Sequence, residues 1–162
     1  MENQTKIILG GAGALLLLAV FLGLNYSDSA AGNNLAAADS GNVVATDGIH
    51  WHPKLEIIID GEQLELPVGI GLTNGHDPMH THETDGTVHL EYPDLVFEGG
   101  TTLGRFFKLW DKDLSPTSVL DYSETNGDGI DFSANGQEIL DPENYQFVDG
   151  KTIKIEVTTN QS

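Results

Sequence analysis

The chain contains no cysteine, and this absence removes several classes of site. Without thiols there are no disulfides, no thiolate zinc sites, no iron–sulfur clusters, no c-type haem attachment and no cysteine nucleophile. A blue-copper centre is excluded as well, because it requires a cysteine thiolate. The folded part of the chain must therefore be stabilised by packing, with or without the help of a bound ion.

Basic residues are scarce. Seven Lys and Arg stand against 25 Asp and Glu in a chain of 162 residues, which gives a formal net charge of −18. Such a surface repels nucleic acid and anionic lipid headgroups, so the sequence predicts no nucleic-acid partner. It attracts cations and favours solubility in high salt. Most of these carboxylates are expected to form a solvated acidic surface.

The sequence has a single long hydrophobic run, over residues 7–24, and it is uncharged. Its length is near the lower limit for a helix that crosses a bilayer. We therefore expect a transmembrane anchor over residues 1–25. Residues 26–46 are rich in Ser, Ala, Gly, Asn and Asp and are expected to form a flexible linker. Residues 47–162 are expected to form one modest domain.

The orientation of the anchor is predicted from its flanking charges. Lys6 is the only basic residue before the apolar run, and the next one in the chain is Lys54. By the positive-inside tendency the N-terminus stays in the cytoplasm, and the domain lies at the cell surface or in the periplasm. The alternative is a cleaved signal peptide with a small-residue cleavage site at residues 36–38. Both alternatives place the domain outside the cytoplasm.

Alternating apolar residues and turn signals predict the strands. Residues 54–60 are β-branched and apolar, Asp60-Gly61 is a turn, and residues 63–66 form the partner strand. Residues 69–77 contain three glycines and are expected to be a loop. In the strand predicted over residues 87–92, Val88 and Leu90 share one face and His89 and Glu91 the other.

One short helix is predicted after Thr101-Thr102, which offer an N-cap. Its apolar stripe, expected to pack on the core, consists of Leu103, Phe106, Phe107 and Trp110. The residues expected to point away from the core are Arg105, Lys108 and Asp111.

Two further turns complete the predicted fold. Asn135-Gly136 is a strong type I′ hairpin signal between residues 131–134 and 137–140, and Asp149-Gly150 leads into a terminal strand over residues 151–158. The sum is an α+β domain of roughly five or six strands, a mostly antiparallel sheet with one packed amphipathic helix. A β-grasp-like arrangement is one form that such a domain takes.

The histidines are the most informative feature. All six fall within 40 residues, at His50, His52, His76, His80, His82 and His89. Four of them form two His-x-His pairs, and in an extended chain residues i and i+2 point to the same side. A turn at Asp85-Gly86 would bring His89 back beside the pair formed by His80 and His82.

Three imidazoles on adjacent strands suit Zn²⁺ or Cu²⁺ and leave a fourth position for water or another residue. His50 or His52 could fill that position or form a second site. The carboxylates expected to orient these ligands are Glu83, Asp85 and Glu91. His76 has no paired neighbour and is interpreted as a loop residue. The metal ligands predicted from the sequence are His80, His82, His89, His50 and His52.

Two weaker signals have simpler explanations. A thioether such as that of Met79 could assist Cu(I), but a lone methionine is more typical of core packing. Residues 126–131 resemble the middle of a calcium loop. The bidentate Glu of such a loop is missing, because Asn135 stands at its twelfth position. Turn chemistry explains this stretch.

The order of these motifs resembles a group of small prokaryotic proteins, membrane-anchored or secreted, that are uncharacterised. The residues that carry the resemblance run from His50-Trp51-His52-Pro53-x-Leu55 through Met79-His80-Thr81-His82, Asp85-Gly86 and His89-Leu90-Glu91 to Thr102-Leu103-Gly104-x-Phe106-Phe107-x-x-Trp110. The resemblance implies no established activity and no particular metal.

Three functions are compatible with these observations. The first is a Cu²⁺- or Zn²⁺-binding module held near the membrane for capture, storage or delivery of the ion. The second is a zinc-dependent hydrolase or hydratase, in which an open position on the metal activates water and Glu83 or Glu91 is the base. The third is a non-catalytic cell-envelope interaction protein whose histidines are incidental.

Overall fold

The structure is a computed structural model that describes residues 39–73 and 75–160. The expected anchor over residues 1–25 lies outside the described residues. Within the described ranges, no helix is long and apolar enough to span a membrane. The last residues of the expected linker belong to the folded part, because strand β1 (Val43–Ala45) pairs with β7 (Val96–Phe97). The fold therefore begins before residue 47.

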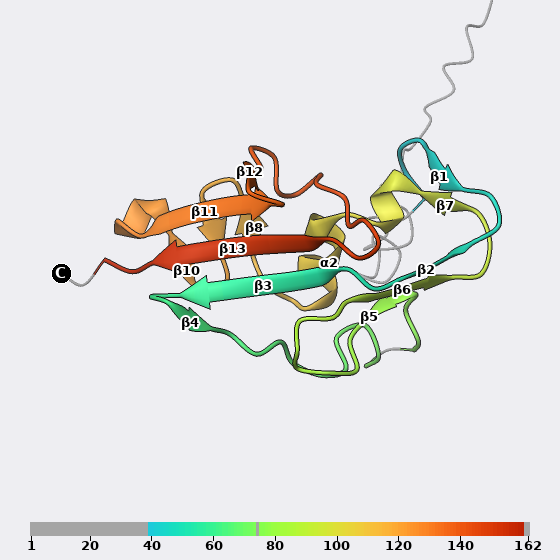
Figure 1. The fold of residues 1–162 in the computed structure, drawn as a ribbon, viewed down its shortest axis with the longest axis horizontal. Helices are drawn as coiled ribbons and strands as arrows, with labels where there is room; N and C mark the ends of the chain where they lie inside the picture. The colour runs from blue at the N-terminus through green and yellow to red at the C-terminus, as the bar shows by residue number, and fades with distance from the viewer. Residues whose placement is uncertain (1–38, 74, 161–162) are drawn as a thin grey trace, which may run out of the picture.

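A five-stranded sheet is the largest unit of the fold, with strand order β12-β11-β13-β3-β4 (Figure 1). Its strands are β3 (Lys54–Ile59), β4 (Glu62–Gln63), β11 (Gly129–Ala134), β12 (Gln137–Glu138) and β13 (Thr152–Thr158). Every neighbouring pair is antiparallel except β3 and β13, which run parallel in the middle. The alternation in β13 buries Ile153, Ile155 and Val157 on one face.

Two tight turns set the register of the outer strands. Asn135 and Gly136, between β11 and β12, have φ angles of 52° and 77°, as a type I′ turn requires. Asp60 and Gly61, between β3 and β4, have φ angles of 51° and 86°. Both predicted hairpins are confirmed. Their returning strands are only two residues long, shorter than predicted.

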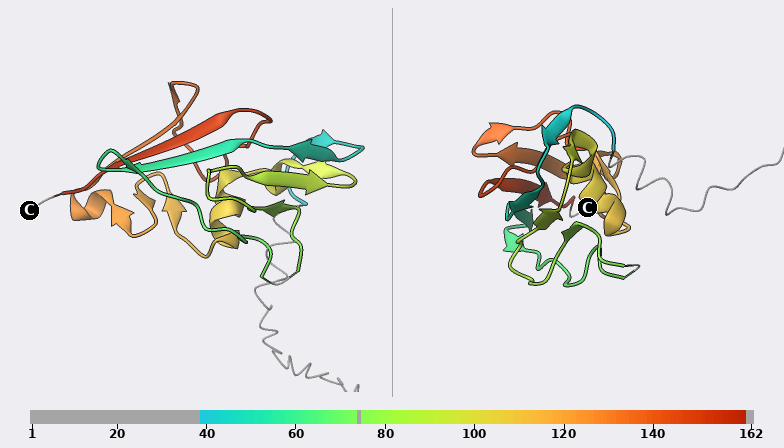
Figure 2. Two further views of the ribbon diagram at one scale, coloured as in Figure 1. Left: turned by 60° about the horizontal axis from the view of Figure 1, so that its bottom comes forward. Right: turned by 90° about the vertical axis from the view of Figure 1, so that its right-hand side faces the viewer.

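Helix α2 (Leu103–Leu109) packs beneath this sheet, as the left view of Figure 2 shows. Thr102 is its N-cap and accepts a hydrogen bond from the Arg105 backbone N–H. Leu103, Phe106 and Phe107 are buried in the same core as the sheet residues. The prediction that Arg105 points away was wrong, because its side chain is buried against the loop that precedes β5.

A second, three-stranded sheet adjoins one end of β3 and carries three of the six histidines, while the other three lie in segments next to its strands. It consists of β2 (Ile49–Trp51), β5 (Met79–His80) and β6 (His89–Tyr92), in the order β2-β6-β5. The chain leaves β2, passes His52 and Pro53, and enters β3 directly. Packing of β3 in the core therefore fixes where β2 lies.

Short elements complete the molecule. A further small sheet is formed by β8 (Leu114–Ser115), β9 (Ser118–Val119) and β10 (Tyr122–Ser123). The described residues also form two 3-10 helices, η1 (Glu98–Gly100) and η2 (Glu124–Asn126). The α+β class, mostly strand with one α-helix among the described residues, is confirmed. There are more strands than the predicted five or six, because many of the strands are only two residues long.

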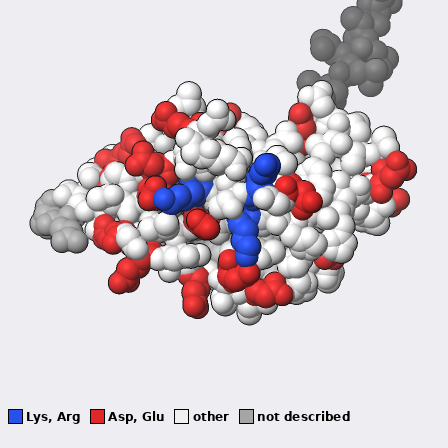
Figure 3. Space-filling model, viewed as in Figure 1, with Lys and Arg blue, Asp and Glu red and all other residues white. Residues whose placement is uncertain are grey.

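Charge is distributed unevenly over the surface. Figure 3 shows acidic side chains spread over one face of the molecule, with Lys and Arg confined to its middle. At η2, turn chemistry holds as predicted: the Asp128 carboxylate accepts from the backbone N–H groups of Ser123 and Asn160.

Candidate metal centre

The three-stranded sheet brings distant histidines to one face. In its register, His80 lies opposite His89, and His50 lies opposite Glu91. The residues that alternate with them, Met79 and Leu90, are fully buried. Because successive side chains point to opposite faces of a strand, burial of these apolar neighbours places the imidazoles of His80 and His89 together on the other face of the sheet. Met79 is thus a core residue, as its pattern favoured.

All six imidazoles form one continuous chain of ring contacts. The ring centroids are 4.8 Å apart for His50 and His52, and 4.9 Å apart for His52 and His89. His89 then meets His80 at 5.4 Å and His82 at 4.9 Å. The predicted return of His89 to the His80/His82 pair through the Asp85-Gly86 turn is confirmed.

His76 closes the other end of this chain. It lies in the loop before β5, as predicted, and its ring centroid is 4.5 Å from that of His80. Sequence spacing gave no reason to include it, since it has no histidine two residues away. The signal available was indirect: the loop that carries it contains Gly71 and Gly75, both with positive φ, and such a loop folds back on itself.

His80 is the most buried of the six, with no exposed side-chain area. Its Nδ1 lies 2.9 Å from the backbone carbonyl oxygen of Asp77, which can only accept, so Nδ1 carries the proton. Burial is the main cause that lowers the pKa of His80, and it favours the neutral ring. The lone pair of neutral His80 is therefore on Nε2, which lies 3.0 Å from Nε2 of His82.

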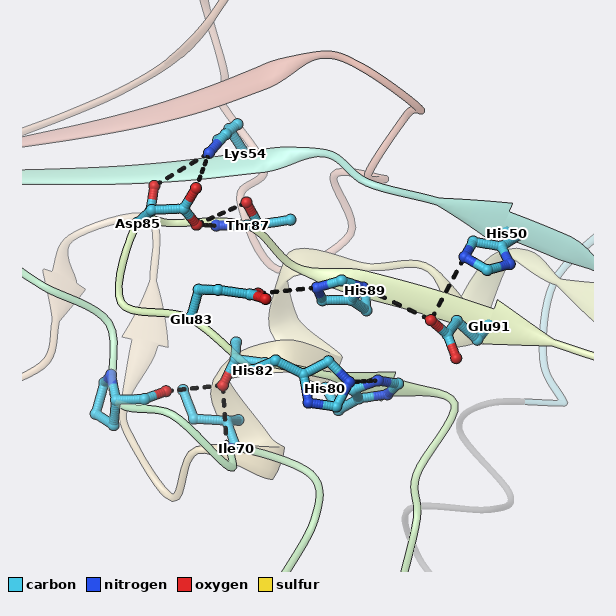
Figure 4. A network of polar contacts seen from close by, with 12 residues as sticks. His50, Lys54, Ile70, His80, His82, Glu83, Asp85, Thr87, His89 and Glu91 are labelled. Atoms are coloured by element: carbon cyan, nitrogen blue, oxygen red, sulfur yellow. Dashed lines mark hydrogen bonds and ion pairs between the residues drawn. The ribbon is translucent and has the colours of Figure 1, made fainter.

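His89 has the opposite tautomer. Its Nε2 lies 3.2 Å from the carboxylate of Glu83, which leaves the lone pair of the neutral ring on Nδ1. That Nδ1 atom is buried and has no hydrogen-bond partner among the described residues. Oε1 of Glu91 lies 3.6 Å from this Nδ1 atom, and Figure 4 shows Glu91 between His89 and His50.

The described residues contain three groups of potential metal ligands, and within each group the ligand atoms lie within 4.8 Å of one another. They are His76/His80/His82, His50/His52/Glu91 and His80/His89/Glu91. All five predicted histidines belong to at least one group, and His76 and Glu91 are added to them. His82 and His89, which the sequence placed on one ion, fall in different groups, although their rings are in contact.

An ion pair between the buried Arg105 and the partly buried Asp77 positions the His80 loop. Both carboxylate oxygens of Asp77 accept from Nη2 of Arg105, at 2.7 and 3.0 Å. Oδ1 of Asp77 also accepts from the backbone N–H of Met79, at 2.9 Å. The same residue therefore links helix α2 to β5 and orients the His80 ring through its carbonyl. Sequence reasoning missed both Asp77 and Arg105.

Of the three carboxylates expected beside the ligands, Glu83 and Glu91 are there and Asp85 is not. Asp85 pairs with Lys54, whose Nζ is 2.6 Å from Oδ2, and accepts from the backbone N–H and hydroxyl of Thr87 (Figure 4). These contacts, led by that with Lys54, hold the pKa of the Asp85 carboxyl well below its usual range. Asp85 thus braces the turn between His82 and His89.

The Asp85 contacts predict an acid dependence of stability. Because the folded pKa lies below the unfolded value of about 3.9, the stabilisation is present above that pH and is lost as pH falls below it. In the metal-free chain, we expect the free energy of unfolding to fall less steeply between pH 5 and 2 in Asp85→Asn than in the wild type. Urea unfolding at each pH measures this. Asp121→Asn, at an exposed position between β9 and β10, is the control, and equal slopes in all three proteins would contradict the assignment.

Comparisons of the chain with protein-family models, curated proteins and solved structures found no match. The resemblance to small histidine-rich prokaryotic proteins stays a prediction.

Proposed function

We propose that this domain binds a transition-metal ion, Cu²⁺ or Zn²⁺, with His76, His80 and His82 as its primary ligands. The observation that carries the proposal is the 3.0 Å separation of the two Nε2 atoms of His80 and His82, together with the hydrogen bond from His80 Nδ1 to Asp77. Metal-bound histidines generally give their second ring N–H to a carbonyl or carboxylate, as His80 does here.

The separation suits two ligands of one ion. Nitrogens about 2.0–2.1 Å from a zinc ion stand about 3.3 Å apart at a tetrahedral angle, and closer at a right angle. Without metal, the same distance is explained by a hydrogen bond from protonated Nε2 of His82 to His80. Metal binding would then displace that single proton and require little movement, because His80 is already fixed.

Nitrogen ligands without a thiolate favour Cu²⁺ over Zn²⁺ when both ions are free, by the Irving–Williams order. The acidic surface would raise the local concentration of either cation. With the anchor predicted over residues 1–25, the domain would capture, store or deliver the ion outside the cytoplasm, next to the membrane.

The fold proposal that goes with this function is a β-grasp-like sheet. Its support is the order of elements: a first hairpin (β3 and β4), helix α2, a second hairpin (β11 and β12), and the last strand β13 inserted parallel to β3. In this arrangement, the histidine-bearing sheet is an addition to the grasp-like core. Its strand β2 precedes β3 in the chain, and its strands β5 and β6 lie between β4 and α2.

Removal of one exposed ligand tests the proposal. We expect His82→Ala to lower the affinity of the full chain, purified in mild detergent, for Cu²⁺ by at least 10-fold, because loss of even a group that only orients a ligand typically costs 10- to 100-fold. Because His82 is exposed, its removal should leave the fold intact. Isothermal titration in a glycine buffer, which competes with weak surface sites, gives the affinity.

Thr84→Ala is the matched control, since Thr84 is exposed in the same loop. Its affinity should equal that of the wild type. Equal affinities for wild type and His82→Ala would reject the primary site. A wild-type chain that takes up no metal in this buffer would reject the function.

One observation favours the metalloenzyme as a second candidate. Beside the His50/His52/Glu91 group is an open hollow of about 420 Å³, lined by residues 47–50 and 91–93. Two histidines and a carboxylate are a ligand set found in hydrolytic zinc sites. Hydrolysis of an activated ester by the zinc-loaded chain would favour this candidate. The contact of all six rings weighs against a protein in which the histidines are incidental.

A further inference from the structure

One ring nitrogen of His89 is buried without a hydrogen-bond partner among the described residues. Its Nε2 is occupied by Glu83, so that in the neutral ring Nδ1 presents a lone pair. Nδ1 is buried, has no hydrogen-bond partner among the described residues, and faces a carboxylate oxygen of Glu91 at 3.6 Å. In the neutral ring, two electron-rich atoms thus face each other with no proton between them. A doubly protonated ring would donate to that oxygen, but 3.6 Å is beyond hydrogen-bond reach.

The same oxygen of Glu91 meets a second imidazole. Nε2 of His50 lies 3.5 Å from Oε1 of Glu91, again a long distance for a hydrogen bond. Oε1 is therefore flanked by one ring from β2 and one ring from β6, as Figure 4 shows. Two donors bound to one ion at about 2.0–2.2 Å stand about 3.3 to 3.6 Å apart at a tetrahedral angle. Both distances fit this requirement.

His52 completes the arrangement. Its ring contacts His50 at 4.8 Å and His89 at 4.9 Å between centroids, so it lies between the two rings that flank Glu91. Ligand atoms of His50, His52 and Glu91 all lie within 4.8 Å of one another. The buried Nδ1 of His89 approaches this group through Glu91.

From these contacts we infer a second metal site formed by His50, His52, His89 and Glu91, beside the primary site and separate from it. It would take a divalent transition-metal ion, with three nitrogen ligands and one carboxylate oxygen. The inference extends the proposed metal binding and rests on the same histidine chemistry, but it uses none of the three primary ligands. The two sites together would employ all six histidines and two tautomers, with His80 bound through Nε2 and His89 through Nδ1.

The second site has its own supporting contact. Glu83 accepts from His89 Nε2, which is the carboxylate–histidine arrangement that fixes a metal-bound ring and raises its basicity. At the primary site, the carbonyl of Asp77 has this role for His80. The rings of His80 and His89 stack at 5.4 Å with an interplanar angle of 9°, which places the two centres side by side.

Metal counting on the full chain tests the inference. The chain, in mild detergent, is incubated with excess Cu²⁺, desalted into a glycine buffer and analysed for copper per chain. We expect two copper ions in the wild type, one in His50→Ala/Glu91→Gln and one in His82→Ala. The side chain of His50 is 69% exposed, so its removal should not disturb the fold. His50→Ala/Glu138→Gln, with the second change on exposed β12, separates the roles of the two residues, and circular dichroism verifies folding.

The outcomes distinguish this inference from the proposed function. One copper ion in the wild type, unchanged in His50→Ala/Glu91→Gln, would overturn the second site and leave the primary site standing. Loss of both ions in that variant would mean a single joint centre and would also overturn it. No copper in the wild type would reject both. Two copper ions retained in Glu91→Gln alone would remove the carboxylate from the proposed ligand set and overturn the four-ligand site.

Discussion

Asp77→Ala should lower the free energy of unfolding of the metal-free chain by about 3 kcal/mol, the lower end of the usual cost of removing one partner of a buried ion pair, because Asp77 itself is 21% exposed. The reason is that Arg105, only 7% exposed, would keep its charge in the core without the carboxylate that accepts from Nη2. The Met79 backbone N–H would lose its acceptor as well. Urea unfolding monitored by circular dichroism measures the change.

The same substitution should weaken metal binding. Asp77 supplies the carbonyl that fixes the His80 tautomer, and its side chain holds that carbonyl in place between α2 and β5. Loss of a contact that orients a ligand typically costs 10- to 100-fold in metal affinity. We expect a fall of that size in Cu²⁺ affinity, measured under conditions where the variant is still folded.

Glu156→Ala is the matched control for stability, because Glu156 pairs with Lys154 at 2.8 Å on the exposed face of β13. An exposed pair of this kind contributes about 0–1 kcal/mol. If Asp77→Ala costs no more than Glu156→Ala, the ion pair does not hold the loop. If stability falls and Cu²⁺ affinity does not, Asp77 has no positioning role for His80.

Local signals in the sequence predicted most of the elements. Asn135-Gly136 and Asp60-Gly61 determine their turns through backbone angles that few other residues adopt, so the hairpins follow from two residues each. Helix α2 was also predicted from local signals, namely Thr102 as its N-cap and the apolar spacing of Phe106 and Phe107. The pairing of β13 parallel to β3 was not predictable in this way, because nothing local joins strands so distant in the chain.

For the candidate site, too, contacts between residues close in sequence were predicted and contacts between distant segments were not. The pair His80/His82 and its neighbour His89 are linked by one turn, so their proximity followed from spacing. His50 and His52 reach them only because β2 pairs with the far edge of β6, a contact between segments about 40 residues apart in sequence. Arg105 was misplaced for a related reason: its helical position faces away from the apolar stripe, but the His80 loop covers that side and buries it.

A single added methyl group is expected to have a large effect at Gly71, which lies against His80. Gly71 has a φ of 78°, and a Cβ added there would overlap the carbonyl oxygen of Met79 and approach Cβ of His80 to 3.2 Å. Gly71→Ala therefore combines left-handed strain of about 1–2 kcal/mol with overpacking of about 1–3 kcal/mol. We expect a total loss of about 3 kcal/mol in unfolding free energy, together with weaker Cu²⁺ binding, because β5 must shift.

Gly69→Ala separates the two causes, since Gly69 has a similar φ of 83° but no atom within 4 Å of an added Cβ. It should lose only the strain energy of about 1–2 kcal/mol and keep the Cu²⁺ affinity of the wild type. Urea unfolding and calorimetric titration of both variants measure the difference. Equal stability losses would mean that the loop yields without moving β5. If Gly71→Ala is clearly less stable but binds Cu²⁺ as tightly as Gly69→Ala, Cu²⁺ binding does not depend on the position of His80. His80 on β5 would then not be a ligand of the primary site.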